Sequence, residues 1–295
     1  MKRVVITGAG GFVGGRLTAH YRDRWDITPL DHKTLELTDH EALHAALQAA
    51  APQLVIHTAA LSNTGYCESH PLESFEVNLQ APAALAKECA ALGAKLVFFS
   101  SDQVYNGTRK LGPLPEDAPL DPVNVYGRHK WEAEQRVLEA CPEAVCLRAS
   151  WMYDFDRPGL KSSTGFWGTL RRSLAGKMPL SMAVREYRGI TWVQPVIEAM
   201  EQMATLPGGV YNMGAENPLN TYATALECLG LLGAEEDVLA LLRPDTDRWP
   251  EFERNLSMDT SRLKAAGCGV DLGDTVGSFA ACLRAFEEQQ GGNVI

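Results

Sequence analysis

Short runs of largely consecutive apolar residues recur along the first half of the chain. They cover residues 4–7, 27–30, 54–60, 95–100 and 144–148. A strand with one face in water alternates between apolar and polar residues, whereas a strand that is buried on both faces does not need to. The pattern therefore predicts five strands in the interior of a sheet.

The stretches between these runs have helical character. Three such segments begin at Asp39, Glu73 and Val125, with Asp39 as an N-cap and Gly93 as a helix terminator. Strands that alternate with helices are joined by right-handed crossovers into a parallel sheet covered on both faces. We therefore predict an α/β chain with a doubly wound parallel sheet, and functional residues at the carboxyl ends of its strands.

The pattern loosens after about Ser150, where aromatic residues, glycine and proline become frequent. A further strand is predicted at 209–214. We expect residues 1–150 to form a dinucleotide-binding domain, to which part of about 181–215 returns. Residues 151–180 and 216–295 would form a smaller, interleaved C-terminal lobe that binds the substrate.

The charge balance narrows the classes of partner. Lysine and arginine total 27 against 37 acidic residues, which gives a net charge of −10. Nucleic acid and anionic membrane surfaces attract basic proteins, so we expect neither as a partner. A small anionic ligand would need local cations.

The cysteines and the lengths of the apolar runs indicate the cellular compartment of the protein. The seven cysteines are odd in number and include no C-x-x-C pair, which predicts reduced thiols. We expect no secretory signal at the start of the chain and no apolar run long enough to span a membrane. These features predict a cytoplasmic protein.

The stretch TGAGGFVGG follows the first predicted strand and precedes a helical segment. In a dinucleotide site, glycines allow a tight turn, close approach of the backbone to a pyrophosphate, and packing of helix on strand. Gly8, Gly11 and Gly14 fit these roles, with Phe12 and Val13 at the start of the helix. The helix N-terminus would face the phosphates.

Asp31 follows the second predicted strand, where a carboxylate would accept the hydroxyls of the adenosine ribose. This favours NAD. His32 and Lys33 come directly after it and would offset the charge of a ribose 2′-phosphate, so the choice between NAD and NADP stays open. A solvated surface position is the alternative for both side chains, and it is the more common one for residues of these types.

A second group of polar residues stands at the end of the fourth strand and at the start of a later helix. Ser101 ends the strand, and Tyr126 and Lys130 share one helix face because they are four residues apart. A nearby ammonium favours tyrosinate, so Tyr126 would exchange a proton with a carbonyl or alcohol near neutral pH. Ser101 would hydrogen-bond the reacting oxygen.

These motifs carry a family resemblance. The stretches LVFFSSDQVYNG, VNVYGRHKWEAE and LRASWMYD resemble the dTDP-4-dehydrorhamnose reductase group of extended short-chain dehydrogenases, as do VIHTAA and GVYNMGAEN. The resemblance implies a Rossmann-type fold and an NAD(P)H-dependent reductase of a keto group on a sugar or nucleotide-sugar. It implies Ser101, Tyr126 and Lys130 as the catalytic triad, with Tyr126 as proton donor. The substrate-binding residues would be Asp102, Gln103 and Trp151. The cofactor-binding residues would be Gly8, Gly11, Phe12, Val13, Gly14, Asp31, His32, Leu37, Ala59, Ala60, Asn78, Ser100, Tyr126 and Lys130.

The sequence departs from the family pattern at two places. VREYRGITWVQP stands where the family often has an Asp-Gln-Gly and Pro-Thr pattern, so the sugar is not identified. Related 4,6-dehydratases use a carboxylic acid where this chain has Gln103, which argues against elimination of water. Three functions stay open: a reductase, an epimerase with tightly held NAD, and a catalytically silent regulatory subunit like that of methionine adenosyltransferase. A homodimer also stays open.

Three weaker signals complete the pattern. His40 and His44 match the H-E-x-x-H zinc motif, but no third ligand follows, and we expect no metal site. Seven arginines in the later half are candidate ligands of a diphosphate, although a solvated arginine is the default for each. The aromatic residues of 151–167 would either stack on a ligand or form the core of the smaller lobe. The arginines are Arg171, Arg172, Arg185, Arg188, Arg243, Arg248 and Arg254.

Overall fold

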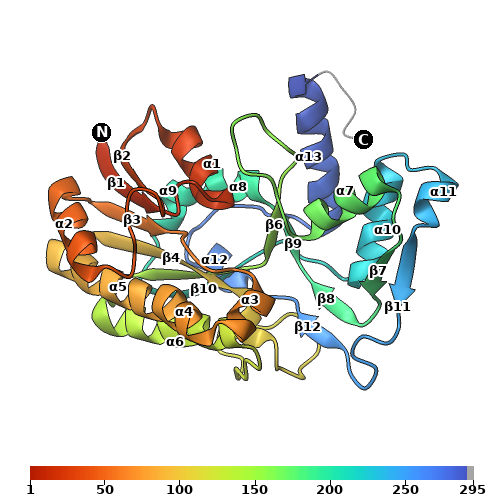
Figure 1. The fold of residues 1–295 in the computed structure, drawn as a ribbon, viewed down its shortest axis with the longest axis horizontal. Coiled ribbons are helices and arrows are strands. Elements are labelled where there is room, and N and C mark those ends of the chain that lie inside the picture. Colours follow the sequence, from red (N-terminus) through yellow and green to blue (C-terminus); the bar gives the residue numbers. More distant parts are fainter. Residues whose placement is uncertain (291–295) are drawn as a thin grey trace.

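The predicted parallel sheet is present in the computed structural model, which describes residues 1–290. Six parallel strands lie in the order β10-β5-β4-β3-β1-β2 (Figure 1). The order reverses direction between β1 and β3, where open α/β sheets form a crevice at their carboxyl ends. All the predicted runs are strands, and their bounds are β1 Lys2–Thr7, β2 Trp25–Leu30, β3 Leu54–His57, β4 Lys95–Ser101, β5 Val145–Ala149 and β10 Gly209–Met213.

Helices cover both faces of this sheet, which confirms the doubly wound architecture (Figure 1). Val4 and Ile6 of β1 pack on one face and Val5 on the other, which explains why the strand has consecutive apolar residues. None of the described helices is long and apolar enough to cross a membrane. The first face carries α1 Phe12–Tyr21, α8 Val193–Glu198, α9 Met200–Met203 and α12 Ser261–Ala265. The second carries α2 His40–Ala50, α5 Ala81–Leu92 and α6 Val125–Ala140.

The helix ends follow the predicted capping residues. The Asp39 carboxylate accepts a hydrogen bond of 3.0 Å from Ala42 N, and Gly93 ends α5 with a left-handed φ of 65°. The segment predicted as one helix from Glu73 instead consists of α4 Pro71–Phe75, a π-helical turn η1 Glu76–Gln80 and then α5. The short α3 Thr64–Ser69 precedes it, and a 3₁₀ turn, η2 Asp102–Tyr105, follows β4.

A separate hydrophobic cluster is formed by residues from the second half of the chain, between Tyr153 and Cys282. It buries Tyr153, Phe155, Phe166 and Trp167 around Phe279, so these aromatic side chains form a core. Its elements include short parallel strand pairs. The strands and helices that contribute to this cluster are β6 Trp151–Tyr153, β7 Leu180–Ala183, β9 Ile190–Trp192, β11 Leu242–Asp245, α7 Phe166–Gly176, α10 Thr221–Leu231, α11 Glu236–Leu239 and α13 Thr275–Gln290. The pair β8 Glu186–Arg188 and β12 Arg254–Leu256 lies outside it.

The boundaries proposed for the smaller lobe stay a prediction. Residues 193–213 pack on the main sheet, but so do Leu263, Cys268 and Leu272, which come from the segment assigned to the lobe. Residues 291–295 of that segment lie outside the described residues.

A buried carboxylate ties the first helix to the later segments. Asp154 is 1% exposed, and it accepts hydrogen bonds from Arg16 Nε of α1 at 3.0 Å and from Arg157 Nε at 2.8 Å. Trp192 Nε1 donates to the same carboxylate at 3.3 Å. Arg16 also reaches the Lys161 carbonyl, so the loop after β6 is held against the helix that follows the glycines. Buried ion pairs of this kind are costly to break, because the remaining charge has no solvent.

Replacement of Asp154 by alanine is therefore expected to lower the free energy of unfolding by about 3–5 kcal/mol. Asp156→Ala is the matched control in the same loop, because its pair with Arg171 is about 40% exposed, and it should cost less than about 1 kcal/mol. Urea unfolding measures both. Equal losses in the two variants would show that the Asp154 contacts do not hold the loop.

Candidate active site at the carboxyl edge of the sheet

The glycine turn brings the ends of β1 and β3 into close contact. Gly8 has a φ of 69°, and a Cβ atom there would lie 2.7 Å from the Ala59 nitrogen. A Cβ on Gly14 would lie 2.2 Å from the Gly8 carbonyl oxygen, so neither position accepts a side chain. Gly11 N donates to that carbonyl at 2.7 Å and closes the turn.

The first residues of α1 fit the phosphate groups of a dinucleotide. The helix begins at Phe12, directly after the turn, and its N-cap Gly11 offers no side-chain hydrogen bond. The N–H groups of Phe12 and Val13 are therefore free of a side-chain cap, as an anion site at a helix N-terminus requires. This is the geometry that the glycine motif predicts.

Asp31 lies directly after β2 and faces the same turn. Its Oδ1 accepts hydrogen bonds from Lys33 N at 2.9 Å and Thr34 N at 3.2 Å, and the first of these is the main cause of a lowered pKa. A Cβ on Gly10 would lie 3.2 Å from Oδ2, which places this oxygen beside the glycines. His32 is exposed, and Leu37 is half-buried on the second core cluster.

The loop after β3 is held in place by a buried amide. Asn78, in the π-helical turn, accepts from Leu61 N and donates to Leu61 O, both at 3.0 Å. Ala59 and Ala60 precede Leu61 and are half-buried beside the glycine turn. Asn78 therefore shapes the loop that carries the two alanines.

The three predicted catalytic residues lie together. Ser101 ends β4, while Tyr126 and Lys130 occupy the first two turns of α6. The Ser101 hydroxyl is close enough to the Tyr126 phenol to lower its pKa, although burial has the larger, opposite effect. Lys130 Nζ donates to the Phe99 carbonyl at 2.8 Å and lies 6.0 Å from the centroid of the Tyr126 ring. All three side chains are less than 10% exposed.

Burial is the largest cause of the pKa shifts of Tyr126 and Lys130. Loss of solvent raises the pKa of Tyr126, so the prediction that the Lys130 charge favours tyrosinate is wrong. The four-residue spacing reveals the nearby ammonium, whereas desolvation depends on the packed structure. Burial also lowers the pKa of Lys130 to about 7, although the Glu134 carboxylate opposes this.

Ser100 points away from Ser101 because successive residues of a strand face opposite sides. Its hydroxyl donates to Glu134, which also holds Arg148 through Oε2 at 2.8 Å. Arg148 in turn donates to the Tyr105 hydroxyl at 2.6 Å. Ser100 thus belongs to a buried network beneath Lys130.

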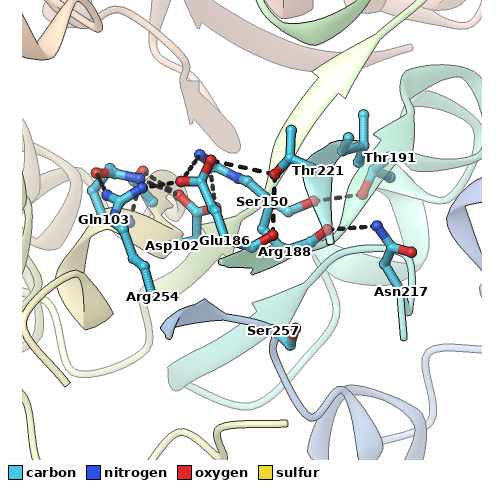
Figure 2. Close-up of polar contacts among 12 residues, drawn as sticks. Asp102, Gln103, Ser150, Glu186, Arg188, Thr191, Asn217, Thr221, Arg254 and Ser257 are labelled. Carbon is cyan, nitrogen blue, oxygen red and sulfur yellow. Dashed lines mark hydrogen bonds and ion pairs between the residues drawn. The ribbon is translucent and has the colours of Figure 1, made fainter. Parts of the chain in front are cut away.

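Two of the predicted substrate-binding residues, Asp102 and Gln103, meet a cluster of charged side chains (Figure 2). Asp102 pairs with Arg188, and the Gln103 Oε1 atom accepts from Arg254 Nη2 at 3.1 Å. Trp151 is 37% exposed, and the Arg188 guanidinium lies 3.7 Å from its ring centroid. The other members of the aromatic group at 151–167 are buried, so Trp151 is the one that solvent reaches.

Sequence reasoning did not single out Glu186, Arg188 or Arg254 as members of this cluster. Glu186 accepts from Arg254, and it lies 3.9 Å from Arg188. Arg188 and Arg254 were two of seven candidate arginines, and the departure from the family pattern at 186–188 was the only local signal. Their carboxylate and amide partners lie 86 and 151 residues away in the sequence, so spacing could not reveal them.

The H-E-x-x-H match has an ordinary surface role. His44 Nδ1 lies 2.8 Å from Glu88 Oε2 of α5, and its side chain is 56% exposed. Within residues 1–290, no three histidine, cysteine or acidic side chains are grouped as metal ligands.

Comparison with known proteins places this architecture in a family. A family profile described as "RmlD substrate binding domain" matches residues 1–268. A dTDP-4-dehydrorhamnose reductase of Streptomyces griseus is 30% identical over 277 residues, which cover 90% of this chain and 88% of the relative. The methionine adenosyltransferase 2 subunit beta of Bos taurus is 28% identical, covering 91% of this chain and 83% of the relative.

Solved structures share the fold at lower identity. The dTDP-4-dehydrorhamnose reductase of Bacillus anthracis, in complex with NADP, superposes with a TM-score of 0.85 at 22% identity and covers 98% of this chain and 100% of its own. The WbmH enzyme of Bordetella bronchiseptica, in complex with NAD+, has a TM-score of 0.80 at 15% identity and covers 99% and 100%. From the profile match over residues 1–268 and the similarity to the Streptomyces reductase, the chain belongs to the RmlD substrate-binding-domain family.

Proposed function

We propose that this chain is an NAD(P)H-dependent reductase of a keto group on a nucleotide-linked sugar. The observation that carries the proposal is the convergence of Ser101, Tyr126 and Lys130 at the carboxyl edge of the sheet, beside a turn shaped for a dinucleotide. The names of the relatives, dTDP-4-dehydrorhamnose reductases among them, support the keto-sugar as substrate.

Each member of the trio has a distinct task in this reaction. The bound dinucleotide supplies a hydride to the carbonyl carbon. Ser101 donates a hydrogen bond to the carbonyl oxygen and holds it in place. Tyr126 stays protonated because burial raises the pKa of its phenol, so it donates the proton that the developing alkoxide needs. Lys130 holds the ribose next to the nicotinamide and stabilises the phenolate that is left behind.

The surroundings of Gln103 favour reduction over elimination of water. Its amide nitrogen donates to Asp102 Oδ1 at 3.2 Å, and its amide oxygen accepts from Asn124 at 3.1 Å. An amide has no acidic proton to give at neutral pH. We therefore assign Asp102, Gln103 and Trp151 to substrate placement.

We propose NAD as the preferred cofactor. Asp31 faces the glycine turn with one oxygen, and its main-chain hydrogen bonds keep it ionised. A carboxylate accepts two ribose hydroxyls but repels a 2′-phosphate. The neighbouring His32 and Lys33 are exposed.

We place the reaction in the cytoplasm. All seven cysteines are free and buried, and burial raises the pKa of several of their thiols. Reduced structural thiols are ordinary in that compartment.

Tyr126→Phe is expected to lower the turnover of dTDP-4-dehydrorhamnose with NADH by a factor of about 100 or more, because the proton donor is lost. Binding of NADH should persist. Tyr66→Phe is the control, since this tyrosine is exposed. Loss of NADH absorbance measures turnover, and NADH fluorescence measures binding.

Three results would redirect the proposal. Full turnover by Tyr126→Phe would remove the tyrosine from the chemistry. NADH binding without turnover by the native chain would favour a regulatory subunit, which its similarity to the bovine methionine adenosyltransferase subunit makes a specific second candidate. NAD that copurifies with the protein, together with sugar conversion without added NADH, would favour an epimerase.

Asp31→Ser is expected to reverse the cofactor preference by removing the charge that repels the 2′-phosphate. The ratio of kcat/KM for NADH to that for NADPH should fall by about 10-fold or more, which corresponds to about 1.4 kcal/mol. Asp23→Ser is the control because this carboxylate is 88% exposed on a turn far from the glycines. An unchanged ratio in Asp31→Ser would place the ribose elsewhere.

The affinity for NADH is expected to fall as pH rises through about 7, since the free protein loses the Lys130 charge there. Above this pH the fall approaches about tenfold per pH unit. Lys130→Met should bind NADH weakly and without this dependence, whereas Lys87→Met, at an exposed position of α5, should follow the native curve. Fluorescence titrations from pH 6 to about 9 would check this; a flat native curve would contradict it.

A further inference from the structure

Arg188 occupies the centre of the charged cluster beside the catalytic trio. Its side chain is 2% exposed, and it pairs with Asp102 while Glu186 lies 3.9 Å away. Figure 2 shows Arg188 among Asp102, Glu186, Ser150 and Asn217. An arginine so deeply buried is rare unless its charge is balanced, and here two carboxylates provide the balance.

The guanidinium contacts two groups that belong to the substrate side of the site. Asp102 follows Ser101 directly, and its Oδ1 accepts from the Ser101 hydroxyl at 3.4 Å. Trp151 stacks on the guanidinium with 3.7 Å between the guanidinium carbon and the ring centroid. A planar guanidinium can hold a carboxylate at its edge and an aromatic ring on its face at the same time.

The strand that carries Arg188 is held firmly. The Arg188 carbonyl accepts from Asn217 Nδ2 at 2.9 Å, and Arg188 pairs in register with Leu256 of β12. A Cβ on the next residue, Gly189, would lie 2.1 Å from the Ala215 carbonyl oxygen, so this backbone packs too closely for a side chain. Arg188 therefore projects from a fixed point.

The charges of the cluster argue against a direct role in binding an anion. Arg188 and Arg254 are matched by Asp102 and Glu186, and Arg254 is paired with Glu186 as well as with Gln103. A diphosphate would have to displace a buried carboxylate from its partner. The accessible member of the group is Trp151, whose side chain is 37% exposed while one ring face rests on Arg188.

We propose that Arg188 is a positioning residue for the reductase reaction. It holds the Trp151 indole as the wall against which the sugar lies, and it holds Asp102 in place next to Ser101 at the reacting carbonyl. The substrate touches Trp151 and not the guanidinium. The inference rests on the proposed function for the identity of the substrate, but the placement of Trp151 by Arg188 does not.

The test uses the full chain labelled with 5-fluorotryptophan, with the Trp151 signal in the fluorine NMR spectrum assigned by its loss in Trp151→Phe. Arg188→Met removes the charge and the stack. Arg188→Lys keeps a charge for Asp102 but offers neither a flat face nor a fork. Arg109→Met is the matched control, since Arg109 is an exposed arginine that stacks 3.5 Å from the Phe252 centroid.

Both Arg188 variants are expected to shift or broaden the Trp151 signal and to raise the KM for dTDP-4-dehydrorhamnose by about tenfold. The affinities for NADH and for dTDP alone should stay within about twofold of the native values, and Arg109→Met should change none of these quantities. If Arg188→Met fails to fold because Asp102 and Glu186 lose a partner, Arg188→Lys decides the question.

Two results would overturn the inference. An unmoved Trp151 signal and a native KM in folded Arg188→Lys would show that Arg188 positions nothing. A loss of dTDP affinity with an unmoved Trp151 signal would show that the guanidinium binds the diphosphate itself. A native chain that does not reduce the sugar contradicts the proposed function instead, and the fluorine signal still tests the placement of Trp151.

Discussion

The parallel register of the central strands is the constraint on which the candidate site depends. Ser101 pairs with Ala149, and Thr7 pairs with His57, so neighbouring strands end at one edge of the sheet. The residues that follow these ends are the glycine turn, the Ala59 loop, Asp102 and Trp151. Helix α6 then returns Tyr126 and Lys130 to the same edge, because a right-handed crossover begins there.

Local signals predicted the parts of the structure that local chemistry determines. Consecutive apolar runs identified the strands, and Asp39 and Gly93 identified helix ends, because a cap depends on a few neighbouring residues. The glycine turn and the Tyr126–Lys130 pair could also be predicted, because the glycines lie in one turn and the pair lies in one helix. The π-helical turn at Asn78 had no such signal, and it interrupts what the sequence presents as one helix.

Contacts between residues far apart in the sequence could not be predicted from it. Asp154 meets Arg16 across 138 residues, and Arg188 meets Asp102 across 86. The raised pKa of Tyr126 arises from burial, which only the packed structure defines. The family resemblance indicated the chemistry. The charged cluster on the substrate side could be identified only from the structure, because its residues come from distant parts of the sequence.

Buried charge has two uses in this molecule. The buried Asp154 and Arg188 charges hold distant segments together, because separating either one from its partner would leave a charge without solvent. At Lys130 burial brings the pKa to about 7, so the same desolvation that costs stability makes the residue responsive near neutral pH.

The central claim is that hydride moves from the dinucleotide to a keto carbon of the sugar. The most direct measurement incubates the protein with NADH deuterated at both C4 positions and dTDP-4-dehydrorhamnose, followed by mass spectrometry and NMR of the sugar product. The account predicts deuterium on the carbon that carried the keto group, with one equivalent of NAD formed. A product without deuterium, or an unchanged sugar with the dinucleotide still bound, would contradict it.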